Sequence, residues 1–67
     1  MNHATLSREL ARVAGALNKA SRSIPSTIKI AASLALATAA QSIRHGDASR
    51  AIIALEHARA LLDSFVA

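Results

Sequence analysis

The sequence has no cysteine, no tryptophan and no tyrosine, and it holds only one phenylalanine and one proline. Without cysteine, a disulfide framework and a thiolate metal site are excluded. The three histidines, at positions 3, 45 and 57, lack the i, i+4 spacing of a helical metal site. A chain of 67 residues buries only roughly 60% of its unfolded surface. Small domains are usually stabilised by a disulfide, a metal or a partner chain, and for this sequence only association with another chain is left.

Long apolar runs are also missing. The most apolar stretch, 30–40, is mostly alanine and has about half of the ~20 residues that a membrane-spanning helix needs. The charges of Arg8, Glu9 and Arg12 interrupt any secretory signal core. We therefore expect a cytoplasmic chain without a membrane span. Residues 1–23 also resemble a mitochondrial transit peptide, but its removal would leave about 44 residues, too few for a comfortable domain.

Catalytic patterns are absent as well. No serine lies in a G-x-S-x-G elbow, and Gly15 and Gly46 are too far apart to form a phosphate-binding loop. We interpret His57 beside Glu56 as a solvated surface neighbour rather than a catalytic pair. The sequence predicts no enzymatic activity, no cofactor and no metal.

What is present favours helix, because alanine, leucine and arginine dominate and no run alternates with period two. We expect residues 1–67 to form one small all-α domain. The first helix is predicted at about 5–23, with Thr5 as its N-cap. Its apolar seam is spaced 4, 3, 4, 3, 4 and consists of Leu6, Leu10, Val13, Leu17, Ala20 and Ile24.

Pro25 interrupts this pattern, and the serines around it favour a chain reversal over a kink in one long helix. A second helix is predicted at about 26–45, with charges only at its ends, Lys29 and Arg44. Because it is apolar around most of its circumference, we expect it to be central and buried on several sides. A ridge of small residues would let a neighbouring helix approach closely: Ala31, Ala35 and Ala39.

The short segment 45–47 ends the second helix. Gly46 suits the left-handed residue after a helix, and Asp47 is a strong N-cap for a third helix at about 48–66. A turn this short predicts an antiparallel helical hairpin. The seam of the third helix is Ala51, Leu55, Ala58, Leu62 and Phe65.

The pattern Gly46-Asp47-x3-Ala51-Ile52-x2-Leu55-x2-Ala58 resembles the turn and second helix of a tetratricopeptide repeat. The resemblance implies a helical hairpin with close alanine-mediated packing. In the preceding helix the family's small residue is matched by Ala39. The family's large aromatic is replaced by Ala35 and its leucine by Thr38.

Charge is distributed unevenly. Five cations and one carboxylate within residues 1–29 give the whole net charge of +4, and the charges after residue 29 cancel. Four of the cations share one side of the first helix, opposite its apolar seam, and Gly15 completes their series. This predicted basic face is an ordinary solvated surface or a site for an acidic protein patch, nucleic acid or an anionic membrane. Its residues are Arg8, Arg12, Lys19 and Arg22.

Nucleic acid and membrane are the weaker partners. No aromatic side chain is available to stack on bases, and the first helix has no Trp or Phe anchor for lipid. The hydrophobic content of 52% instead exceeds what so small a chain buries alone, which predicts a homodimeric bundle. The expected packing and dimer core is Leu10, Val13, Leu17, Leu34, Leu36, Ile43, Ile52, Leu55, Leu62 and Phe65.

These observations predict a non-enzymatic small helical interaction protein that docks on a partner protein and regulates or inhibits it. Adaptors, anti-activators and chaperone-like accessory factors of bacteria, plasmids or phages are of this kind. The alternative is a nucleic-acid-associated regulator that uses the basic face. Whether the first helix packs within its own chain, packs against a second chain or continues into the second helix stays open at this stage.

Overall fold

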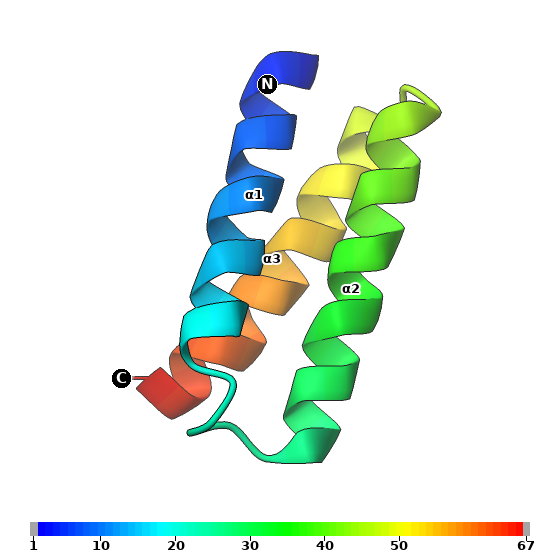
Figure 1. Ribbon diagram of the computed structural model, residues 1–67. Coiled ribbons are helices and arrows are strands. Elements are labelled where there is room, and N and C mark those ends of the chain that lie inside the picture. Colours follow the sequence, from blue (N-terminus) through cyan, green and yellow to red (C-terminus); the bar gives the residue numbers. More distant parts are fainter. Residues whose placement is uncertain (1, 67) are drawn as a thin grey trace.

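Three helices pack together in the computed structural model, which describes residues 2–66 (Figure 1). They are α1 (His3–Lys19), α2 (Ser26–Arg44) and α3 (Ala48–Val66). Residues 2–66 contain no strand, so the predicted all-α class is confirmed. Both α1 and α3 run from the top of Figure 1 to the bottom, and α2 runs the opposite way. None of the described helices combines the length and hydropathy needed to cross a membrane.

The helix α1 begins earlier than the sequence predicts. Asn2, not Thr5, is its N-cap, and the Asn2 side-chain oxygen accepts a hydrogen bond of 2.8 Å from the Thr5 N–H. Asparagine is a better N-cap than threonine, which explains the correction. The helix also ends at Lys19 rather than near residue 23.

The chain reverses between α1 and α2, as predicted. A turn closes where the Ser23 N–H donates to the Ala20 carbonyl at 2.9 Å. Pro25 then occupies the N-cap position of α2 with φ −57°, and its carbonyl accepts hydrogen bonds from Ile28 and Lys29. Because proline disfavours helix at the residue before it, α1 cannot run on into α2. The first helix packs against α2 and α3 of its own chain, because Leu6, Val13 and Leu17 share one core with residues of both.

The α2–α3 turn is closed by hydrogen bonds at every step. Gly46 has φ +76°, its N–H donates to the Ile43 carbonyl at 3.1 Å, and the Asp47 N–H donates to the Ser42 carbonyl at 2.8 Å. This pair of bonds is a Schellman motif. The Asp47 carboxylate then accepts from the Arg50 N–H at 3.1 Å and caps α3. The predicted helical hairpin is confirmed.

Alanine fills the contact between α2 and α3. The four alanines at positions 32, 39, 51 and 58 are all 0% exposed. A methyl group is the smallest side chain that a helix can place at a contact, so the two helices approach closely. Larger side chains fill the remaining space among the three helices: Leu6, Val13, Leu17, Ile24, Leu36, Ile43, Leu55 and Leu62.

Most residues of the predicted packing and dimer core lie inside this chain. Six of them are buried, and Leu10 and Ile52 are half-buried against them. Leu34 and Phe65, however, are 64% and 48% exposed, so they lie outside the core of the single chain. The expectation that α2 is buried on several sides is also wrong. Its buried residues lie on one side, and three helices leave nothing to cover the other.

Candidate interaction surfaces

The predicted basic face is only partly assembled. Arg8, Arg12 and Lys19 are exposed on α1, as expected. Arg22 is exposed too, but it lies in the connection after the end of α1 rather than on the helix. Three of the four cations therefore share one helical surface.

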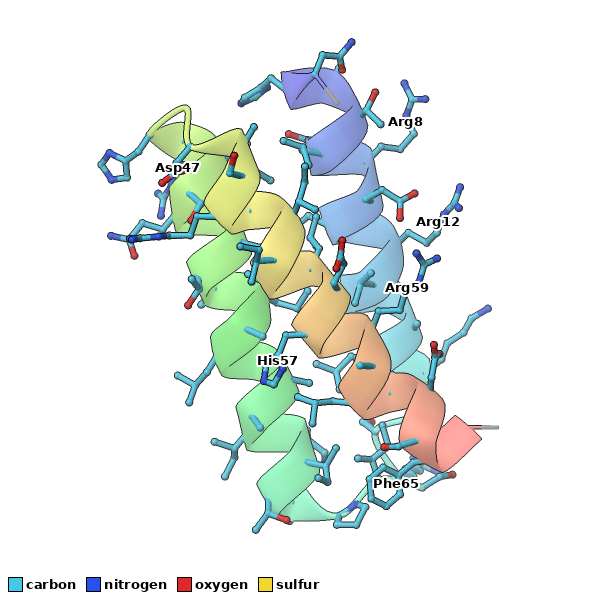
Figure 2. All side chains as sticks on the ribbon, turned by 180° about the vertical axis from the view of Figure 1, so that it is seen from behind. Arg8, Arg12, Asp47, His57, Arg59 and Phe65 are labelled. Carbon is cyan, nitrogen blue, oxygen red and sulfur yellow. The ribbon has the colours of Figure 1, made fainter. Side chains whose placement is uncertain are left out.

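The structure adds Arg59 of α3 to this surface. Arg12 Nη1 lies 3.5 Å from Glu9 Oε1, and Arg59 Nη1 lies 4.0 Å from Glu9 Oε2. Figure 2 shows Arg8, Arg12 and Arg59 along the same side of the molecule. The sequence alone does not assign Arg59 to this surface, because Arg59 lies in the part of the chain where the charges cancel. Only the packing of α1 beside α3 brings it to the basic face.

A groove of about 470 Å³ lies between α1 and α3. Its floor is apolar, with Val13 and Leu62 buried and the methyl groups of Ala16 and Ala20 exposed or half-buried. Charged side chains stand on both sides of this floor. The α1 side carries the cations Arg12 and Lys19, and the α3 side carries the cation Arg59 and the carboxylate of Asp63.

A second depression of about 130 Å³ continues the groove towards the start of α3. The two share Val13 and Arg59. This second part also contains Glu9 and Glu56, so the charge changes sign along the groove. The basic part is the larger one, and it lies towards the C-terminal ends of α1 and α3.

The outer side of α2 is a different surface. Ile30 and Leu34 are 60% and 64% exposed, and Ala37 and Gln41 continue the row with a spacing of 4, 3, 4. We call these four residues the α2 outer stripe. The stripe contains no charged residue. Ile53 of α3, which is 68% exposed, is a further exposed apolar side chain of the hairpin.

Within residues 2–66, no group of three or more His, Cys, Asp or Glu side chains could hold a metal ion. Glu56 and His57 are both exposed, and Figure 2 shows His57 on the outer side of α3.

No family model, curated protein or solved structure matches this chain. The resemblance to a tetratricopeptide repeat therefore rests on residues 46–58 alone. The surfaces of the three helices are what indicates a function for this chain.

Proposed function

We propose that this chain is a non-enzymatic interaction protein that forms a homodimer, docks on a partner protein and regulates it. One observation carries the proposal: large apolar side chains of α2 and α3 lie exposed on the outside of the bundle. Ile30, Leu34 and Ile53 are each at least 60% exposed. Exposed apolar clusters mark interaction sites in small proteins.

The α2 outer stripe is the proposed dimer contact. Two copies of a chain with net charge +4 repel each other, and the stripe is a surface where they meet without bringing charges together. Fully burying an Ile or Leu side chain is worth about 1.5–3 kcal/mol. Burying Ile30 and Leu34 of both copies therefore contributes about 6–12 kcal/mol, against an association cost of ~4–15 kcal/mol. The expected dimer is weak, with micromolar affinity at best.

The basic face, enlarged by Arg59, is the proposed contact with the partner protein. An acidic surface would be attracted to it and oriented by it, and charge complementarity of this kind raises association rates and specificity. The dimer contact lies on α2 and the partner contact on α1 and α3. A dimer can therefore present two basic faces at once.

An affinity capture from cells of the source organism tests the proposal. The wild type is immobilised beside two variants, Arg8→Ala/Arg12→Ala/Lys19→Ala/Arg22→Ala and Ile30→Ser/Leu34→Ser. We expect a specific protein that the wild type retains and that the basic-face variant loses, and we expect its activity to change when the chain is added. If the wild type retains nothing beyond an empty support, the proposal is contradicted.

A nucleic-acid-associated regulator is the second candidate, and the position of Arg59 beside Arg8 and Arg12 favours it. A basic face with about four phosphate contacts predicts binding that weakens with salt, with a log–log slope of about −3 to −4. Duplex and single-stranded DNA and RNA titrated at about 50 mM salt test this candidate. No binding under these conditions excludes it.

A further inference from the structure

We propose that the basic part of the groove between α1 and α3 binds a short acidic amphipathic helix of the partner protein. This inference rests on the proposed function and names the kind of segment that is recognised. The groove combines two features that one ligand has to satisfy together. These are an apolar floor, built on Val13, Ala16 and Leu62, and an excess of positive charge around it. The three cations of the lining, Arg12, Lys19 and Arg59, outnumber its one carboxylate, Asp63.

The small floor residues favour a helix as the occupant. Ala16 and Ala20 project only methyl groups into the groove, so the side chains of another helix can settle between α1 and α3. A partner helix that buries an apolar stripe here would contact Val13 and Leu62 as well. Helix-in-groove recognition places apolar anchors at i, i+3, i+4 and i+7 in this way.

The position of the cations favours carboxylates on that helix. Arg12 and Lys19 are seven residues apart on α1, which separates them by about 10 Å along the helix axis. Arg59 faces them from α3 across the floor. A ligand with a single anionic group would reach only one of these cations. A helix with acidic residues on both sides of an apolar stripe, repeated over two turns, would reach all three.

The length of the acidic segment is limited by the other end of the groove. Glu9 and Glu56 line the second depression and would repel further carboxylates. The matching ligand therefore carries its acidic residues over about two turns and continues with neutral or basic residues.

In the unbound chain, Glu9 contacts two of the cations of the groove. It lies 3.5 Å from Arg12 and 4.0 Å from Arg59, and its side chain is 24% exposed. It holds both guanidinium groups at the groove and competes with an incoming carboxylate. Replacing it with the neutral Glu9→Gln should therefore tighten the binding of an acidic helix two- to fivefold.

A nucleic acid is a poorer occupant for this groove. Phosphates would satisfy the cations, but the apolar floor would face a charged backbone and gain nothing from it. Phe65 is the one aromatic residue of the chain, and it does not line the groove. Base stacking on aromatic side chains is therefore absent from this site.

The direct test uses two labelled synthetic peptides and fluorescence anisotropy. One peptide carries a Leu/Ala stripe flanked on both sides by Glu over two turns, and the other has Gln in place of each Glu. We expect the full-length wild type to bind the Glu peptide at least tenfold more tightly than the Gln peptide. A folded wild type that shows no preference for the Glu peptide at concentrations up to ~1 mM overturns the proposal.

Two pairs of variants distinguish binding in this groove from an attraction that depends only on net charge. Arg12→Gln/Arg59→Gln should weaken binding of the Glu peptide at least tenfold. Arg44→Gln/Arg50→Gln removes the same charge from exposed positions outside the groove and should change it less than twofold. Equal losses in the two double variants would mean that the peptide responds to net charge, which contradicts a site.

The second pair leaves the charge unchanged and adds a large side chain, in one variant inside the groove and in the other outside it. Ala16→Phe should weaken binding of the Glu peptide at least fivefold, whereas Ala11→Phe, on an exposed part of α1 away from the groove, should leave it unchanged. Unchanged binding in Ala16→Phe would overturn the proposal. So would a DNA duplex that displaces the peptide and is itself lost in Arg12→Gln/Arg59→Gln, because phosphates would then be the natural occupant.

Failure of this proposal differs from failure of the proposed function. A partner protein that is still captured by Ala16→Phe and by Arg12→Gln/Arg59→Gln shows that docking is real but uses another surface. A wild type that captures no partner contradicts the proposed function itself, whatever the peptides do.

Discussion

The hairpin of α2 and α3 and the helix α1 are held in the fold by different means. The hairpin is joined by alanine contacts and by a hydrogen-bonded turn with Gly46 and Asp47 at its centre. The helix α1 adds larger side chains, among them Leu6 and Leu17, and is tied to α2 through a proline turn. The hairpin, with four cations against three carboxylates, is nearly neutral, whereas α1, with three cations against one carboxylate, is basic.

This difference assigns a separate task to each region. Close alanine packing joins α2 and α3, while Ile30 and Leu34 of the α2 outer stripe are left exposed. The helix α1 covers the other side of the hairpin and brings three cations against one carboxylate. Its edge against α3 forms the groove.

Two leucines on α2 separate the inside of the hairpin from its outside. Leu36 is 8% exposed and Leu34 is 64% exposed. Leu36→Asp places an unpaired charge in the core at a cost of about 4 kcal/mol or more, which exceeds the stability expected of so small a chain. Circular dichroism should show loss of helix. Leu34→Asp should keep its helix content, and an unfolded Leu34→Asp would contradict the exposed outer side of α2.

Overpacking tests the alanine contact itself. Ala58 is 0% exposed, whereas Ala60 on the same helix is exposed. Ala58→Leu should destabilise the fold by ~1–3 kcal/mol, because no space exists for the added atoms. Ala60→Leu should change stability by less than about 0.5 kcal/mol in urea unfolding. Equal effects of the two substitutions would show that α2 and α3 do not approach closely.

The two glycines should respond with opposite signs. Gly46 has φ +76°, so Gly46→Ala should destabilise the protein by about 1–2 kcal/mol. Gly15 lies in the interior of α1, and a Cβ added there would meet nothing within 4 Å. Gly15→Ala should therefore stabilise the protein by up to about 1 kcal/mol. Thermal unfolding followed by circular dichroism measures both shifts, and a lower Tm for Gly15→Ala would mean that this position needs glycine for packing.

The smallest effect on stability is expected from the ion pairs of Glu9. Glu9→Gln removes the contact to Arg12 within α1 and the contact to Arg59, which joins α1 to the hairpin. Partly exposed pairs of this kind are worth about 0–1 kcal/mol, and salt screens them. Urea unfolding should shift by less than about 1 kcal/mol at low salt and hardly at all at ~1 M salt. A loss of several kcal/mol would mean that Glu9 holds α1 in place, which contradicts the view that apolar contacts do so.

The sequence predicts the helices and the hairpin well, because their signals are local. Pro25, Gly46 and Asp47 each act on their own turn, and the apolar spacing of α1 reports its buried side directly. The predicted N-cap Thr5 is wrong because Asn2, three residues earlier, competes for the same role. Local signals of this kind fix the bounds of a helix to within a few residues.

The surfaces are harder to predict, because they depend on which helix faces come together. Alanine does not indicate which face of a helix is buried, because its small side chain is compatible with buried and exposed positions alike. The core at positions 32 and 39 is therefore alanine, while the larger Leu34 between them faces outward. Arg59 could not be assigned to the basic face before the position of α3 beside α1 was known.

We propose above all that the α2 outer stripe is a contact between two copies of this chain. Sedimentation equilibrium of the wild type and of Leu34→Asp, from ~10 µM to ~1 mM, tests it most directly. We predict a concentration-dependent dimer for the wild type and a folded monomer for Leu34→Asp. A wild type that stays a folded monomer over the whole range, or a Leu34→Asp variant that dimerises as well as the wild type, would contradict the claim.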